Sequence, residues 1–130
     1  MTHEQIIKPK TAKLAKQAGF DWKCNERYNE RYATNDSEPL YVSPRDNWNQ
    51  YAGLYSAPTQ SVLQRWLREV KNVVLLVDFN NDEDCEENER YGVTIYIGNE
   101  RIVELATYPT YEEALEAGEQ KCLTILIEKQ

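Results

Sequence analysis

A scarcity of histidine and glycine limits the chemistry open to this chain. Its 130 residues include one histidine, His3, and five glycines. Nucleophilic triads need a histidine within the site, so the position of His3 beside the terminus argues against them. The glycines form neither a phosphate-binding loop nor a dinucleotide fingerprint, which argues against nucleotide-dependent enzymes. We therefore expect no catalytic residues and no bound cofactor.

Cysteines and long apolar runs are also scarce. The three cysteines, Cys24, Cys85 and Cys122, are widely spaced and odd in number, which fits neither a disulfide framework nor a zinc knuckle. We interpret them as reduced thiols in a cytosol. Residues 1–16 contain no signal-type apolar run, and no stretch approaches the roughly 20 apolar residues of a membrane span. We expect a cytoplasmic protein without a membrane segment.

Basic residues are outnumbered. With 15 Lys and Arg against 22 Asp and Glu, the formal charge is -7, and its long-range field repels phosphate backbones and anionic membranes. A local basic patch can still overcome that field, so nucleic-acid binding is disfavoured without being excluded. With 41% apolar and 11% aromatic residues, the chain can bury a core of its own. We expect a single domain, 1–130, with an N-terminal part, 1–56, and a module, 57–130.

The N-terminal part predicts little regular structure. Residues 10–19 alternate alanines and lysines, with Thr11 placed to cap and Gly19 placed to end a short helix. From Phe20 to Tyr55 the pattern is irregular, interrupted by prolines and rich in Trp and Tyr. This composition is too aromatic for a disordered linker. We expect the segment to wrap over the rest of the protein, with a short strand near 40–42.

The module has a regular pattern. A Pro-led helical stripe, a β-branched run and an alternating run follow one another, then a Gly98-Asn99 turn, a further strand ended by Pro109, and a helix capped by Thr110. The predicted class is α+β: an αβββα module with a three-stranded antiparallel sheet packed against two helices, plus the irregular N-terminal wrapping segment with one short helix. The predicted elements are helix 58–70, strands 73–79, 91–97 and 101–108, and a helix from 111.

The tetrapeptide NERY occurs at 25–28, 29–32 and 88–91. Four residues are too few for a solenoid repeat. We interpret the copies as chance similarity of polar loops, with an Arg and Tyr recognition surface as the alternative.

The αβββα order, from Pro58–Leu67 to Thr110–Leu126, resembles the double-stranded-RNA-binding domain over about the C-terminal half of the chain. In that family, lysines at the start of the last helix clamp phosphates. Here Tyr111, Glu112 and Glu113 stand at the matching positions. Two carboxylates in place of two ammonium groups repel phosphate, so the resemblance implies the fold without RNA binding.

The whole chain is similar to a group of uncharacterised small proteins of gut Bacteroidetes and their prophages or mobile elements. Three segments carry the similarity: Thr11–Phe20, with the pattern TxKLAKxxGF; Ala57–Glu69, with APTQSxLQxWLRE; and Tyr111–Gly118, YEEALEAG. The resemblance implies an accessory protein of a bacterial or phage genome and supplies no catalytic residues.

One acidic stretch, Asp78–Glu89, has the oxygen spacing of a calcium loop. The match is incomplete, because Glu83 replaces the glycine of the sharp turn and the flanking residues predict strands. We therefore favour an acidic hairpin loop that keeps sheet edges soluble. The weak metal-ligand candidates are Asp78, Asn80, Asp82, Glu86 and Glu89.

Two aromatic residues have alternative interpretations. Trp66 shares a helical stripe with Leu63, Leu67 and Val70, which favours a core position over base stacking. Tyr96 faces away from the apolar side of its strand, either as a binding residue or under the N-terminal segment.

We expect a non-catalytic accessory protein of phage or mobile-element type that binds another protein. Two helices on one side of the sheet leave its second face for the aromatic segment or for a partner. The alternative is a nucleic-acid-binding protein with the RNA-binding-domain-like fold, favoured by any basic stripe. An enzyme would need a deep pocket with two carboxylates in different environments. The partner and the oligomeric state stay open.

Overall fold

The computed structural model describes residues 4–34 and 36–130, so His3 lies outside the described residues. The described residues form three α-helices and two three-stranded antiparallel sheets, which is an α+β fold. The elements are α1 (Pro9–Ala18), β1 (Cys24–Asn29), β2 (Leu40–Asp46), η1 (Trp48–Gln50), β3 (Leu54–Ser56), α2 (Gln60–Lys71), β4 (Val73–Phe79), η2 (Glu87–Glu89), β5 (Tyr91–Ile97), β6 (Glu100–Tyr108) and α3 (Tyr111–Glu128).

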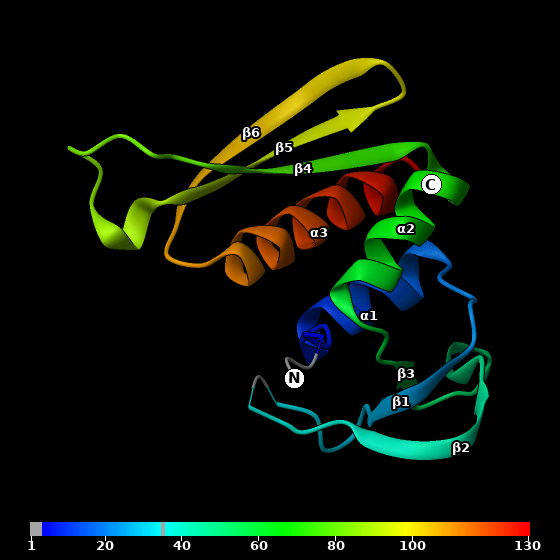
Figure 1. Ribbon diagram of the computed structural model, residues 1–130. Helices are drawn as coiled ribbons and strands as arrows, with labels where there is room; N and C mark the ends of the chain where they lie inside the picture. The colour runs from blue at the N-terminus through cyan, green and yellow to red at the C-terminus, as the bar shows by residue number, and fades with distance from the viewer. Residues whose placement is uncertain (1–3, 35) are drawn as a thin grey trace.

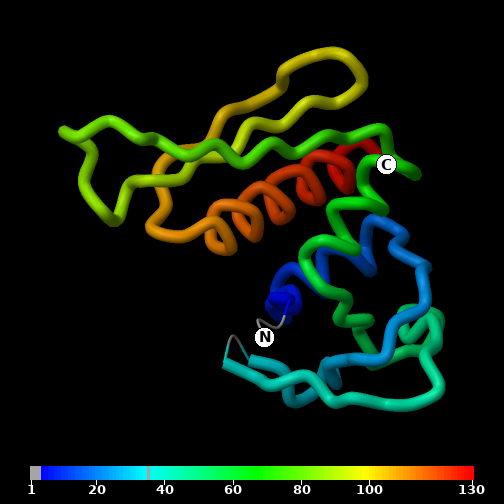
Figure 2. The backbone as a smooth tube through the Cα atoms, in the orientation of Figure 1, coloured from blue at the N-terminus to red at the C-terminus, as the bar shows by residue number. Residues whose placement is uncertain are grey.

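The three helices lie between the two sheets (Figure 1). One sheet has the strand order β2-β1-β3 and the other β4-β5-β6. Helix α3 runs along one face of the β4–β5–β6 sheet, and α1 packs against α3 and β3. The tube in Figure 2 shows the same order of layers, with the N-terminal sheet on the far side of the helices from β4, β5 and β6.

The predicted αβββα order is present from α2 to α3, and its helix ends follow from local chemistry. The Thr59 side chain accepts a hydrogen bond from the backbone N–H of Val62, and Asn72 ends α2 in the left-handed conformation. At the start of α3, the Thr110 side chain accepts from the backbone N–H of Glu113, as the capping pattern predicts.

The N-terminal part differs from its prediction. The segment predicted to wrap irregularly instead forms the β2-β1-β3 sheet, and the strand predicted at 40–42 is the beginning of β2. In β1, whose sequence is CNERYN, only Tyr28 is buried, so the strand shows no apolar alternation. Its pairing with β3 places Tyr28 opposite Tyr55, and both rings join the core. Long-range pairing, which local pattern does not reveal, therefore determines this sheet.

Side chains from every layer form one apolar core. Trp66 is 1% exposed, and its ring meets that of Phe20 edge-on at 5.3 Å between centroids. The predicted core position of Trp66 is confirmed, whereas Val70 of the same predicted stripe is 52% exposed. Helix α3 approaches β5 closely at Gly118, where an added Cβ would lie 2.8 Å from a methyl group of Val93. This glycine lets α3 lie flat on the sheet.

Candidate interaction surface

The β4–β5–β6 sheet has one face on the helices and one face on solvent. Side chains alternate between the faces of a strand, so the buried Val73 and Leu75 of β4 place Leu76 on the outer face. Leu76 is 49% exposed and pairs with Thr94 of β5, which pairs in turn with Glu104 of β6. The neighbouring row across the three strands consists of Val74, Tyr96 and Arg101.

Helix α3 lies on the opposite face of the sheet (Figure 1). No α-helix or strand of residues 4–34 and 36–130 packs on the outer face. The aromatic N-terminal segment, which was one predicted cover for Tyr96, lies beyond the helices. Ile102, at an irregularity in the pairing of β5 with β6, is also exposed. The outer face therefore presents apolar side chains to solvent on both of its edge strands, β4 and β6.

Three aromatic rings lie close together at the end of the same sheet that is next to the beginning of α3. Phe79 and Tyr91 are paired across β4 and β5, with ring centroids 5.3 Å apart. The Tyr91 ring meets that of Tyr111, the first residue of α3, edge-on at 6.4 Å. Phe79 is 59% exposed and Tyr111 is 44% exposed, and none of the three rings belongs to the apolar core. We call these three residues the aromatic platform.

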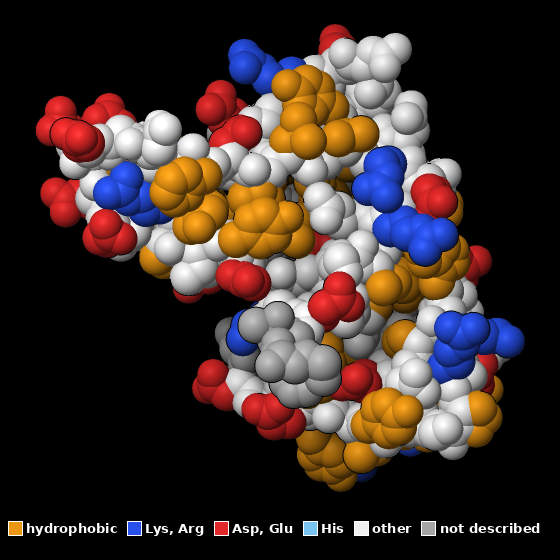
Figure 3. Space-filling model, in the orientation of Figure 1, with side chains coloured by type: hydrophobic (Ala, Val, Ile, Leu, Met, Phe, Trp, Pro, Cys, Tyr) orange, Lys and Arg blue, Asp and Glu red, His pale blue; other side chains and the backbone are white. Residues whose placement is uncertain are grey.

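Negative charge is concentrated around the platform. Residues 72–113 contain eleven of the 22 acidic residues but two of the 15 basic residues, giving a formal charge of -9. The other residues contain 11 acidic and 13 basic residues, a formal charge of +2. Figure 3 shows the acidic side chains gathered on the arm that carries the β4–β5 connection, with apolar side chains beside them. Residues 72–113 therefore carry the net negative charge of the molecule, and the other residues carry a small net positive charge.

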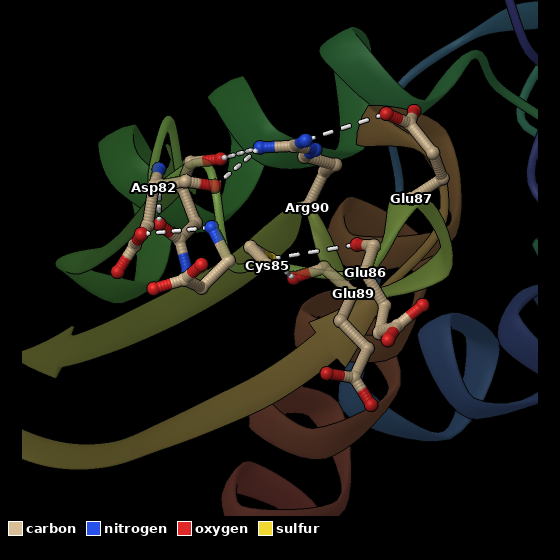
Figure 4. Close-up of polar contacts among 8 residues, drawn as sticks. Asp82, Cys85, Glu86, Glu87, Glu89 and Arg90 are labelled. Carbon is tan, nitrogen blue, oxygen red and sulfur yellow. Dashed lines mark hydrogen bonds and ion pairs between the residues drawn. The ribbon is translucent and has the colours of Figure 1, made fainter.

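The β4–β5 connection, residues 80–90, is organised by its own backbone and by one arginine. The Arg90 guanidinium donates to the carbonyl oxygens of Asn80 and Asp82 at 3.1 and 3.0 Å and pairs with the Glu87 carboxylate at 3.3 Å (Figure 4). The side-chain oxygen of Asn80 accepts from the backbone N–H of Asp82. The loop therefore holds a defined shape although its side chains are mostly exposed.

The five calcium-loop candidates lie in different parts of this arm. Asp78 is on the outer face of β4, where it accepts from the Thr94 hydroxyl at 3.4 Å. Glu86 and Glu89 flank the end of the loop, and their carboxylates lie apart from Asp82 (Figure 4). Among the described residues, no group of three or more His, Cys, Asp or Glu side chains is placed to hold a metal ion.

We predict that the acidic arm has no tight calcium site. Calorimetric titration with calcium is expected to show no binding tighter than about millimolar, the weak end of loop affinities, because the ligands do not converge. Asp78→Ala serves as the matched variant. A micromolar transition that disappears in this variant would contradict the prediction and make the arm a calcium site.

A polar hollow of about 620 Å³ lies between the start of α3 and the N-terminal segment. The Glu116 carboxylate in its wall accepts hydrogen bonds from the backbone N–H of Lys8 at 2.9 Å, from the Thr11 hydroxyl and from the Gln60 amide at 2.8 Å. These donors come from the beginnings of α1 and α2. Glu116 thus joins three helices, and both of its carboxylate oxygens already accept hydrogen bonds from the protein.

Glu119, one turn further along α3, has a different environment. It is 0% exposed, and neither carboxyl oxygen has a hydrogen-bond partner among the residues that the structure describes. Burial, and secondarily the charge of Glu116, raises the pKa of Glu119 well above its usual value. Glu119 does not line the hollow. The two carboxyl groups therefore differ in environment but do not offer a substrate an acid and a base in one cavity.

In comparisons with known proteins, no protein family, no curated protein and no solved structure matches this chain. Residues 4–34 and 36–130 include no helix that combines the length and apolarity needed to cross a membrane. The geometry of the chain itself therefore supplies the grounds for a functional proposal.

Sequence reasoning missed the aromatic platform and the buried carboxyl groups. Tyr111, which begins the last helix, is 44% exposed, and the local pattern gives no sign of its contact with Tyr91. Glu116 and Glu119 were not expected in the interior. The small residues Ala12 and Ala15 of α1, both fully buried, were the available signal, because they let α1 approach α3 on its polar side.

Proposed function

We propose that this protein acts in the cytoplasm without catalysing a reaction, by binding another protein through the β4–β5–β6 sheet. The observation that carries the proposal is the uncovered outer face, where Leu76 and Ile102 are exposed. Apolar side chains grouped on an open sheet face are typical of protein-binding surfaces. The resemblance to prophage and mobile-element proteins supports an accessory role of this kind.

The test compares proteins captured by the native chain and by a variant with Leu76→Gln and Ile102→Gln. Both substitutions remove apolar contact and leave the charge unchanged. Val70→Gln is the matched control, because Val70 is equally exposed but lies on α2. We expect quantitative mass spectrometry of host extract to show partners on the native chain and the control that the double variant loses. Equal recovery by all three chains would contradict the assignment of this surface, and no enriched protein would contradict the function.

Duplex RNA is expected not to bind. The start of α3 offers free backbone N–H groups to an anion, but a helix N-terminus contributes only about 0.3 to 1 kcal/mol, and Glu112 and Glu113 are already there. The segment around it carries -9. At physiological salt, a gel shift should show no complex even at micromolar protein. The variant with Glu112→Lys and Glu113→Lys tests whether the missing clamp is the cause. Salt-sensitive binding by the native chain would instead favour the nucleic-acid alternative.

A further inference from the structure

The aromatic platform lies outside the apolar core of the described residues. The Tyr91 ring contacts those of Phe79 and Tyr111, and none of the three belongs to the core cluster. The strands β4 and β5 extend past the beginning of α3, so no α-helix lies on this end of the helix-side face, which is next to the short 3-10 helix η2 (Figure 1). A cluster of exposed rings that neither fills the core nor is covered by another element is available to a partner.

The surroundings of the platform determine which partner fits. Glu112 and Glu113 follow Tyr111 directly, and residues 82–89, which include six carboxylates, follow Phe79. The nearest cation of the arm, Arg90, is committed to loop carbonyls and to Glu87, with only 19% of its side chain exposed. These carboxylates adjoin the platform residues in sequence, and among residues 4–34 and 36–130 the Arg90–Glu87 contact is the one ion pair that involves them.

This combination favours a guanidinium group over other ligands. A cation over an aromatic face is attracted by the ring quadrupole, and arginine also stacks its plane on the ring. The surrounding carboxylates accept its fork of N–H donors. Phosphate groups meet the opposite sign of charge and are repelled. Lysine matches the charge but lacks the planar group, so it fits the carboxylates better than the rings.

We propose that the aromatic platform and its carboxylate rim bind an arginine-rich segment of the protein partner. This inference rests on the proposed function, because it names the chemistry of the partner that the β4–β5–β6 sheet binds. The partner segment would lie on the helix-side end of the sheet, with arginine side chains over Phe79 and Tyr111 and their guanidinium groups among Glu112, Glu113 and the arm.

The test measures fluorescence anisotropy of labelled (Arg-Gly)6 and (Lys-Gly)6 peptides. The platform variant carries Phe79→Ala and Tyr111→Ala. The matched control carries Tyr32→Ala and Tyr41→Ala, which remove two rings that are at least as exposed in the N-terminal part. We expect the platform variant to bind (Arg-Gly)6 more weakly by about twofold to fivefold for each ring removed, whereas the control binds as the native chain does. The affinity for the (Lys-Gly)6 peptide should fall by a smaller factor in the platform variant.

Salt dependence provides a second readout. Because the removed rings are uncharged, the platform variant should keep the salt slope of the native chain while its affinity falls. If charge attraction alone caused binding, the platform variant and the native chain would bind each peptide with equal affinity. That result would overturn the proposal. Absence of (Arg-Gly)6 binding at low salt, or tighter binding of duplex DNA, also overturns it. Far-UV circular dichroism confirms that each variant is folded, and Tyr111→Ala alone replaces the pair if it is not.

These outcomes are separate from those of the capture experiment. If (Arg-Gly)6 does not bind but the outer-face variant still loses captured proteins, the protein-binding function holds and the arginine chemistry is wrong. If the capture experiment finds no partner, the peptide result describes a surface without the proposed function.

Discussion

Replacement of Trp66 by alanine is expected to lower the free energy of unfolding by about 3 to 5 kcal/mol. The side chain is 1% exposed and lies in α2 between Leu63 and Leu67, which are both fully buried, with Phe20 against its ring. A cavity at this point would lie where α2 meets the N-terminal part. Because domains of this size are stable by only roughly 5 to 15 kcal/mol, such a loss leaves the fold marginal or unfolded.

Denaturant unfolding followed by far-UV circular dichroism measures this effect without relying on tryptophan fluorescence. Val70→Ala on the same helix is the control, and its exposed position predicts little change. The Trp66 indole N–H is buried, and no atom of residues 4–34 and 36–130 accepts a hydrogen bond from it. Trp66→Phe should therefore cost less than Trp66→Ala, since it removes an unsatisfied donor and retains most of the ring. A Trp66→Ala variant as stable as the parent would show that the core is placed incorrectly.

The second large effect concerns pH and Glu119. Burial raises the pKa of Glu119 in the folded chain, so the folded state retains a proton that the unfolded state releases above about pH 4.5. Below the pKa of Glu119 in the unfolded chain, the carboxyl is protonated in both states and stability does not change with its titration. Between the unfolded and folded pKa values, stability falls by about 1.4 kcal/mol for each pH unit, and the loss ends once Glu119 is ionised in both states.

Glu119→Gln removes the titration and nearly preserves the shape of the side chain. We expect the free energies of unfolding of the variant and the native chain to differ by a constant amount below about pH 4.5. Above that pH, the stability of the variant relative to the native chain should increase progressively. Glu128→Gln, at the exposed end of α3, is the control and should show no such trend. Stability differences that stay flat between pH 4 and 8 would be inconsistent with a buried neutral Glu119.

The elements of the module follow directly from sequence pattern. β4 and β5 begin and end where the β-branched run and the alternating run predict, at Val73–Phe79 and Tyr91–Ile97. Local chemistry is sufficient here, because Thr59 and Thr110 cap the helices and Pro109 follows the end of β6.

The N-terminal sheet does not follow from pattern because its strands are stabilised by residues far away in the chain. The three NERY copies make this plain: 25–28 lies in β1, 29–32 passes from the end of β1 into a turn, and 88–91 leads from η2 into β5. Identical tetrapeptides take different conformations when different partners pair with them.

The candidate surfaces were predictable only in part. The prediction of helices on one side of the β4–β5–β6 sheet implies a second face without helices. Whether the N-terminal segment covers that face depends on where this segment folds, and it lies beyond the helices (Figure 1). The aromatic platform could not be predicted, because Phe79 and Tyr111 are 32 positions apart and are joined only through Tyr91, which contacts both rings.

The separation of charge between residues 72–113 and the remainder gives the molecule a permanent dipole. In the field of a cationic surface, that dipole experiences a torque that turns the acidic arm forward before any contact forms. Such steering acts on the association rate constant, which should fall as ions screen the field. The dissociation rate constant depends on short-range contacts and should change much less. The β4–β5 connection, residues 80–90, can thus orient an encounter while contributing no residue to the apolar core.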